Sequence, residues 1–183
     1  MPPLRLPGEV LEFWFSEQSR PLWFEKNAVF DDEIRSRFGA NVSAACIGDL
    51  DYWVRAVDSS LALVLLLDQF PRNIHRGTLR AFASDARARD IAGTVVDRGF
   101  DRRAPLDRRF FFYLPFEHSE ALADQERCVA LNRASGDADA LKWAELHADI
   151  IRRFGRFPHR NAVLGRVSTP QEQEFLDSGG FAG

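Results

Sequence analysis

The chain has 183 residues, of which 45% are hydrophobic, and a net charge of −3. This length suits one domain with a sizeable core, so we expect a single helical domain over residues 1–183. The acidic balance argues against nucleic-acid binding, and the longest apolar run is far short of the roughly 20 residues of a membrane span. With two cysteines only, the composition is typical of a soluble, cytoplasmic protein.

Helical signals dominate the first third of the chain. Residues 9–18 predict a first helix. Asn27 is a suitable N-cap for a second helix, because acidic residues follow it in the first turns. Large apolar residues then recur every four positions up to about Gly48.

The third predicted helix begins at Asp58 and is apolar on all faces through Leu67. A helix without a polar face is typical of the centre of a protein. We expect Pro71 to end this helix, because proline lacks the N–H group that would continue the hydrogen-bond ladder.

The middle of the chain is more ambiguous. A helix is expected somewhere between Thr78 and Arg98, with either Thr78 or Ser84 as its cap and Gly99 as its stop. Pro105 suits the first position of a short helix through Leu114. The aromatic run within that segment, residues 110–113, is equally compatible with a buried strand.

Three further helices are predicted towards the end. The first begins at Ser119 and ends near Ala134, and the second begins at Asp137 and ends at Gly155. The sequence Thr-Pro-Gln-Glu from Thr169 is a capping box with proline at the first helical position. The pattern as a whole predicts an all-α protein with short connections.

The first candidate for a functional motif is Asp-Gln-Phe-Pro-Arg-Asn, residues 68–73. Asp68 falls at the end of the most hydrophobic helix, where the helix dipole disfavours a carboxylate. Such a buried carboxylate needs a partner, and arginine is the best one. The motif is equally compatible with a structural ion pair.

The second motif is Pro-Phe-Glu-His-Ser-Glu, residues 115–120. His118 is our candidate general acid or base, because histidine titrates near neutrality. In the alternative interpretation, Ser119 is only a helix cap and Glu120 an ordinary acidic residue of the first turn. His147 lies on an apolar helix face, and we interpret it as a core histidine.

The third motif covers residues 153–166, where arginine and phenylalanine alternate with glycine and proline. Five arginines and no acidic residue occur between residues 151 and 166. This composition is typical of a pocket wall that binds phosphate or carboxylate. Alternatively, these arginines are the counter-ions of Asp68, Glu117 and Glu120.

Several kinds of site are disfavoured. The four histidines and two cysteines show no metal-ligand spacing. The chain contains neither a phosphate-binding glycine loop nor a dinucleotide fingerprint, and the residues identify no cofactor. No segment is long enough to bind a single nucleic-acid strand by alternating basic and aromatic side chains.

Three stretches, LLLDQFPRNIHR, LPFEHSE and RFGRFPHRNAVLGRVSTPQE, resemble a mainly bacterial family called domain of unknown function 924. The resemblance extends from about Val10 to Leu176. It implies an all-helical fold similar to tetratricopeptide-like arrays, and no activity. The family's hallmark positions match Asp68, Gln69, Arg72, Asn73, His118, Glu120, Arg153, Arg156, His159, Arg160 and Asn161.

These observations lead to three hypotheses. In the first, the protein binds a small anion through Asp68, Arg72, Asn73, Arg153, Arg156, Arg160 and Asn161, and His118, His159 and Glu120 are the candidate catalytic residues. In the second, it is a tetratricopeptide-like module for a protein or peptide partner. In the third, the polar motifs only fix the helix packing.

Overall fold

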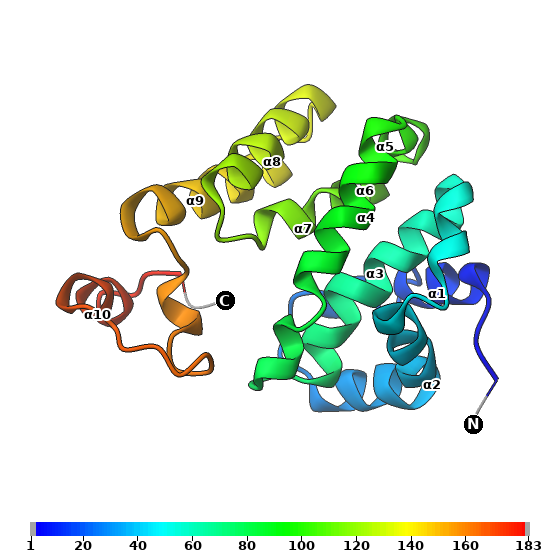
Figure 1. Ribbon diagram of the computed structural model, residues 1–183, viewed down its shortest axis with the longest axis horizontal. Coiled ribbons are helices and arrows are strands. Elements are labelled where there is room, and N and C mark those ends of the chain that lie inside the picture. The colour runs from blue at the N-terminus through cyan, green and yellow to red at the C-terminus, as the bar shows by residue number, and fades with distance from the viewer. Residues whose placement is uncertain (1–2, 182–183) are drawn as a thin grey trace. The chain divides into compact units, whose positions relative to one another are not determined.

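The computed structural model describes residues 3–181 and is all-α, with no strand among those residues (Figure 1). The predicted all-α class is therefore confirmed, while the tetratricopeptide-like arrangement stays a prediction. The α-helices are α1 (Pro7–Trp14), α2 (Ala28–Ile47), α3 (Val57–Ile74), α4 (Asp85–Asp97), α5 (Phe100–Arg103), α6 (Leu106–Arg109), α7 (Leu114–Glu117), α8 (Leu122–Ser135), α9 (Ala138–Phe154) and α10 (Pro170–Asp177). The 3₁₀ turns are η1 (Arg20–Leu22), η2 (Asp51–Arg55), η3 (Leu79–Phe82), η4 (Phe110–Phe112) and η5 (Pro158–Arg160).

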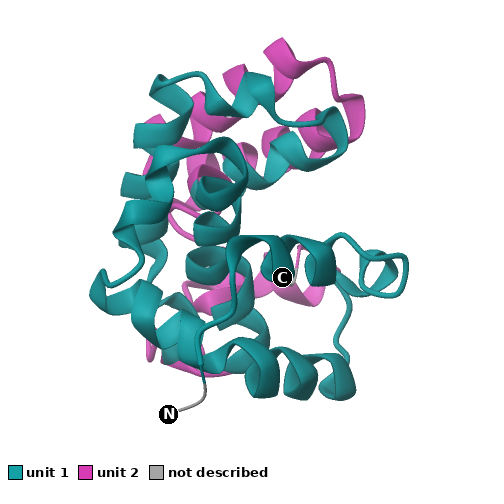
Figure 2. Ribbon diagram, turned by 90° about the vertical axis from the view of Figure 1, so that its right-hand side faces the viewer, with its two compact units in different colours: residues 1–76, 80–115 teal, residues 77–79, 116–183 magenta. Residues whose placement is uncertain are grey.

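The chain divides into two compact units (Figure 2). Unit 1 comprises residues 1–76 and 80–115, and unit 2 comprises residues 77–79 and 116–183. The expectation of one domain over residues 1–183 stays a prediction. None of the helices in residues 3–181 is both long and apolar enough to cross a lipid bilayer.

Unit 1 is built around α3, which packs against α1, α2 and α4 (Figure 1). Every residue from Leu61 to Pro71 is buried, as expected for a helix that is apolar on all faces. Aromatic rings from other elements complete this core, and Phe70 lies 5.2 Å from Trp14 and 5.3 Å from Phe38 between ring centroids. The central position predicted for this helix is confirmed.

The prediction that Pro71 ends α3 is wrong, because the helix continues to Ile74. A proline at this position leaves the carbonyl of Leu67 without its usual N–H donor. The hydroxyl of Ser84 donates a hydrogen bond of 2.6 Å to that carbonyl. Since Ser84 is engaged in this way, it makes no side-chain cap on α4, although it occupies the N-cap position.

Unit 2 contains the paired helices α8 and α9, followed by η5 and α10 (Figure 1). Asp137 caps α9 by accepting a hydrogen bond from Ala140 N–H, and Gly155 follows the helix in the left-handed conformation, φ 69°. The capping box predicted at Thr169 is present on α10. The helix ends predicted at Asp137, Gly155 and Thr169 are therefore confirmed.

Several other boundaries differ from the prediction. The first helix ends at Trp14 rather than at residue 18, and the segment predicted as one short helix from Pro105 contains α6 followed by η4. The aromatic run at residues 110–113 is not a strand, because Phe110–Phe112 form η4. Helix α8 begins at Leu122 rather than at Ser119. The hydroxyl of Ser119 instead donates to Asp124 and accepts from Ala121 N–H, which makes a separate turn before the helix.

Candidate functional site

The first predicted motif forms an ion-pair cluster within unit 1. Arg72 donates to both carboxylate oxygens of Asp85, at 2.9 and 3.0 Å, and lies 3.5 Å from Oδ1 of Asp68. Asp68 is 1% exposed and accepts a hydrogen bond from Gln69 at 2.7 Å. The guanidinium group thus neutralises a buried carboxylate at the end of α3, which satisfies the requirement inferred from the sequence.

Asn73 belongs to a second cluster in unit 1, centred on Asp31. Its side-chain amide donates to Asp31 at 2.8 Å, and Arg76 donates to both oxygens of the same carboxylate at 2.7 and 2.9 Å. The sequence around Arg76 does not indicate its acidic partner, because that partner is 45 residues away. These contacts connect the end of α3 to the first turn of α2.

The second and third motifs meet within unit 2. Glu120 accepts two hydrogen bonds from Arg166, at 2.7 and 2.9 Å, and one from the backbone N–H of Phe157 at 2.8 Å. Burial alone would raise the pKa of Glu120, but these hydrogen bonds and the Arg166 charge lower it below its ordinary value. Glu120 is therefore ionised and connects the turn before α8 to the loop after α9.

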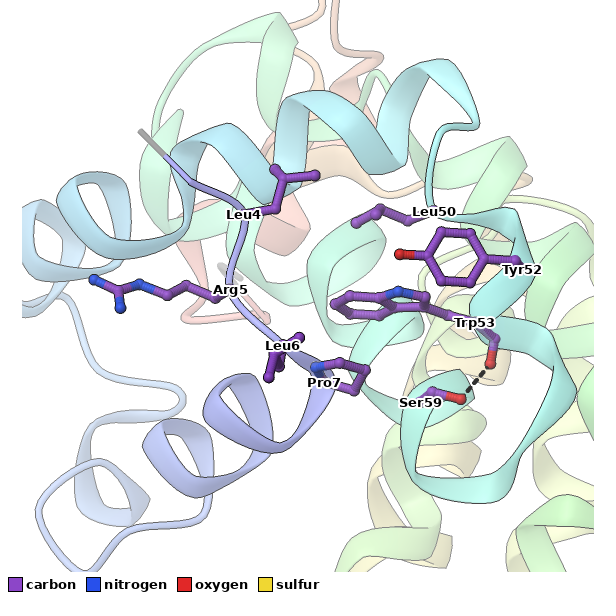
Figure 3. Close-up of a pocket in the computed structure, with 8 residues that line it drawn as sticks. All are labelled: Leu4, Arg5, Leu6, Pro7, Leu50, Tyr52, Trp53 and Ser59. Atoms are coloured by element: carbon purple, nitrogen blue, oxygen red, sulfur yellow. Dashed lines mark hydrogen bonds between the residues drawn. The ribbon is translucent and has the colours of Figure 1, made fainter. Parts of the chain in front are cut away.

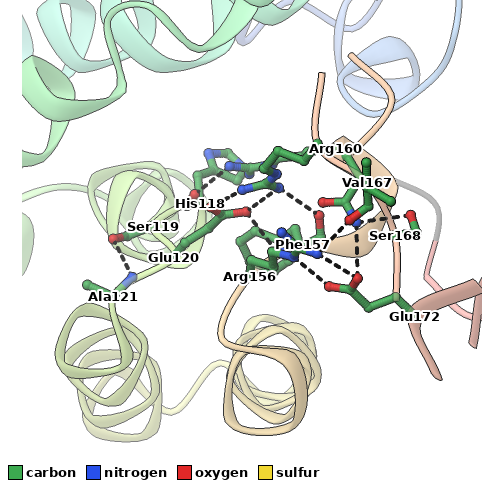
Figure 4. A network of polar contacts seen from close by, with 12 residues as sticks. His118, Ser119, Glu120, Ala121, Arg156, Phe157, Arg160, Val167, Ser168 and Glu172 are labelled. Carbon is green, nitrogen blue, oxygen red and sulfur yellow. Dashed lines mark hydrogen bonds and ion pairs between the residues drawn. The ribbon is translucent and has the colours of Figure 1, made fainter. Parts of the chain in front are cut away.

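Arg156 and Glu172 form a further pair in this network (Figure 4). Arg156 donates to the two carboxylate oxygens at 2.6 and 2.7 Å, and to the carbonyl of Val167 at 2.9 Å. The bonds from Arg156 lower the pKa of Glu172 to about 2. Glu172 also accepts from Thr169 N–H at 2.7 Å, so one carboxylate closes the capping box and holds Arg156.

Arg160, which Figure 4 labels, and Asn161 complete the network. Arg160 is 7% exposed, donates to the carbonyl of His118 at 2.9 Å, and lies over the ring of Phe157 at 4.5 Å. The Asn161 amide donates to the hydroxyl of Ser168 at 3.1 Å. Arg160 thus fixes the backbone at His118, and Asn161 binds a side chain of the segment before α10.

Burial determines the protonation of two histidines of unit 2. Burial, and next the charge of Arg160, lower the pKa of His159 to about 3. Burial likewise lowers the pKa of His147 to about 4, and its Nδ1 lies 2.8 Å from the carbonyl of Trp143. His147 is 6% exposed, so its interpretation as a core histidine is confirmed. Both rings are neutral at pH 7, which makes His159 a weak general base.

A shallow hollow of about 780 Å³ lies at the surface of unit 2, and its lining includes two of the predicted ligand-binding residues. It is lined by Arg153, Phe154, Arg156, Thr169, Gln171 and Glu172. The guanidinium group of Arg153 lies over the rings of Phe154 and Phe175, at 4.9 and 5.3 Å. The hollow therefore combines a cation with aromatic faces, as inferred for the third motif.

Unit 1 has a hollow of different character, with a volume of about 230 Å³ (Figure 3). It is lined by Leu4, Arg5, Leu6, Pro7, Leu50, Tyr52, Trp53 and Ser59. Most of these side chains are apolar, and none was among the predicted site residues. The sequence gives little indication of this hollow, because its lining comes from short segments without a repeating pattern.

The predicted residues are thus distributed over both units. Asp68, Arg72 and Asn73 lie in unit 1, and His118, Glu120, Arg153, Arg156, His159, Arg160 and Asn161 lie in unit 2. The predicted counter-ion role holds for Glu120, which pairs with Arg166 of the third motif, whereas Asp68 pairs with Arg72 of its own motif and Arg156 pairs with Glu172. Glu172 could have been found from the capping box, whereas the arginines that bind Asp31 and Asp85 lie 45 and 13 residues away from them.

Within residues 3–181, no group of three or more histidine, cysteine, aspartate or glutamate side chains is arranged to hold a metal ion. The donors that do meet are carboxylates with guanidinium groups, a combination that satisfies charge internally.

Comparison with known proteins shows which family and which solved structure this chain resembles. The family model for DUF924, bacterial proteins of unknown function, matches residues 10–180. A solved structure of a protein of unknown function from Agrobacterium tumefaciens is similar to this chain, with 44% sequence identity and a TM-score of 0.91. The match covers 94% of this chain and 97% of that one. No curated protein matches significantly.

Proposed function

We propose that this chain, which belongs to the DUF924 family of bacterial proteins of unknown function, binds a small anion in the hollow of unit 2. The anion would be a phosphate or a carboxylate, held by Arg153 beside the first turn of α10. This proposal retains the anion predicted from the sequence but moves its principal contact to Arg153.

The engagement of the arginines is the observation that carries the proposal. Arg72, Arg156, Arg160 and Arg166 all donate hydrogen bonds to groups of the protein itself. Among residues 3–181, the side chain of Arg153 donates no hydrogen bond, and its ion pair with Asp149 is long, at 3.8 Å. Its side chain is 53% exposed. The N–H groups of Arg153 are therefore available to an incoming oxyanion.

The surroundings of Arg153 support binding more than catalysis. The rings of Phe154 and Phe175 hold the guanidinium plane by cation–π contact, which reduces the entropy lost when a ligand binds. The predicted catalytic residues His118, Glu120 and His159 do not line the hollow. We therefore propose binding without a proton-transfer step.

The test is isothermal titration of the protein with inorganic phosphate and with acetate at low ionic strength. We expect one of these anions to bind, and Arg153→Ala to weaken its binding by about tenfold or more, the usual effect of losing a charged hydrogen bond. Arg133→Ala is the matched control, because Arg133 is an exposed arginine of the same unit that pairs with Glu145. Equal affinity of Arg153→Ala and the wild type would contradict the proposal.

Peptide binding is a second candidate function, and the apolar hollow of unit 1 favours it. Leu4, Leu6 and Tyr52 at its rim are 46%, 68% and 57% exposed. A short apolar peptide would cover these side chains and gain their burial energy. Tyr52→Ser should weaken binding of a leucine-rich peptide, while Phe24→Ser, at an exposed position outside the hollow, should not. The same affinity for both variants would exclude this use of the hollow.

A further inference from the structure

The side chain of Phe181 lies against a group of aromatic residues in unit 2. Its ring centroid is 4.6 Å from His147, 5.2 Å from His159 and 6.4 Å from Trp143. The planes are inclined at 67° to His147 and 83° to His159, an edge-to-face geometry. These distances and angles are the ones at which aromatic rings attract each other.

The aromatic group exists without Phe181, because its members also contact one another. Phe157 is fully buried, and its ring lies 5.6 Å from His147 and 5.5 Å from His159. Trp143 and His147 are both on α9, four residues apart, and His159 is on η5. The elements that carry these rings are fixed by the helix pairing and by the polar network around Arg160.

Phe181 itself is attached through a glycine pair that follows α10. The N–H of Gly180 donates to the carbonyl of Phe175 at 2.9 Å, and the N–H of Gly179 donates to that of Leu176 at 3.2 Å. This is a Schellman motif, with Gly179 in the left-handed conformation, φ 81°. A side chain on Gly180 would meet the carbonyl oxygen of Phe175 at 2.5 Å, so glycine is required there. The chain can therefore turn back from α10 towards α9.

The environment of the two histidines suits an aromatic ligand that donates a hydrogen bond. Burial keeps both rings neutral at pH 7. In the described part of the chain, Nδ1 of His159 is buried and has no hydrogen-bond partner. A phenylalanine ring offers nothing to this nitrogen, whereas a phenol offers an O–H group.

We propose that Trp143, His147, Phe157 and His159 form a binding site for an aromatic ring, and that Phe181 is its occupant in this structure. The ligand class is a small phenol, which would replace the Phe181 ring and add a hydrogen bond. This site is distinct from the hollow around Arg153, since none of these residues lines that hollow.

The test is a thermal-unfolding series with phenol on the wild type and on Phe181→Ala. We expect Phe181→Ala to unfold at a lower temperature than the wild type, and phenol to restore several degrees of the loss, because a ligand that fills the vacated volume stabilises the folded state. Phe24→Ala is the matched control, since Phe24 is 67% exposed and its removal leaves no enclosed space. Phenol should change the unfolding temperature of this control no more than it changes that of the wild type.

Histidine titration by NMR provides a second, independent readout. Removal of Phe181 should move the pKa of His147 from about 4, and that of His159 from about 3, upwards towards 6.5, and phenol should reverse the shift. The proposal is overturned if phenol stabilises Phe181→Ala no more than Phe24→Ala. It is equally overturned if the histidine titration is identical with and without Phe181. Neither result would affect anion binding by Arg153.

Discussion

Arg156 and Glu172 are joined by two hydrogen bonds, of 2.6 and 2.7 Å, although they lie 16 residues apart. The pair connects the turn after α9 to the first turn of α10. The same carboxylate closes the capping box at Thr169. Arg156 therefore stabilises the fold of unit 2. This is the structural role that the sequence analysis gave as the alternative to ligand binding.

Arg156→Ala should lower the unfolding temperature by several degrees, because it leaves the carboxylate of Glu172 without its counter-charge. Arg156→Lys should cause a smaller decrease, since an ammonium group replaces one of the two bonds. Calorimetry of both variants beside Arg133→Ala checks this order. An Arg156→Ala protein as stable as Arg133→Ala would show that the pair contributes nothing.

The same pair predicts a loss of stability in acid. The pKa of Glu172 is about 2 in the folded chain, against 4.5 for an ordinary glutamate. Its contribution is thus complete above pH 4.5 and is lost as the pH falls towards 2, where the folded state takes up the proton. Glu172→Gln should reduce the slope of the unfolding free energy against pH in this range. The reduction should correspond to the uptake of up to about one proton. Chemical denaturation at several pH values measures the slope, and an unchanged slope would contradict the assignment.

A third prediction concerns Ser84, whose hydroxyl satisfies the carbonyl of Leu67. Ser84→Ala should cost about 1–3 kcal/mol, the penalty of a buried polar group without a partner. In a Pro71→Ala background the cost should be smaller, because alanine restores the N–H that donates to the same carbonyl. A double-mutant cycle by urea unfolding measures this coupling. Additive effects would mean that Ser84 does not compensate for the proline.

His159 provides a fourth prediction. Its pKa is about 3 in the fold and 6.5 in an ordinary histidine, because it is buried beside the positive charge of Arg160, with His147, His118 and Glu120 also near. Between these pH values the unfolded chain takes up a proton that the folded chain does not, so stability decreases as the pH falls below 6.5. His159→Phe should reduce this decrease. By NMR, the His159 resonance should not shift between pH 5 and 8, and a midpoint near 6.5 would disprove its burial.

The sequence predicted the fold best where local chemistry decides the outcome. Asn27, Asp137 and Thr169 are caps in the structure because their side chains need only N–H groups three residues away. Pro71 misled the prediction, since the donor that compensates for it, Ser84, is 17 residues from Leu67. Ser119 misled it as well, because its hydroxyl is used by Asp124.

The candidate site shows the same limit. The sequence identified Arg156, Glu120 and Asp68 as important polar residues, and each is engaged in a charged network. It could not identify their partners, because a guanidinium group is equally suited to any carboxylate that the fold brings near. The availability of the Arg153 N–H groups was also unpredictable, since it depends on which arginines the fold brings next to a carboxylate.

The most direct test of the anion site is to follow the side-chain Nε–H signals of arginine by NMR during titration with inorganic phosphate and, separately, acetate. For the anion that binds, we expect the signal of Arg153, assigned through its loss in Arg153→Ala, to shift and saturate with ligand. The Nε–H signal of Arg156, which already donates to Glu172, should shift much less. An Arg153 signal that stays in place in both titrations would contradict the proposed function.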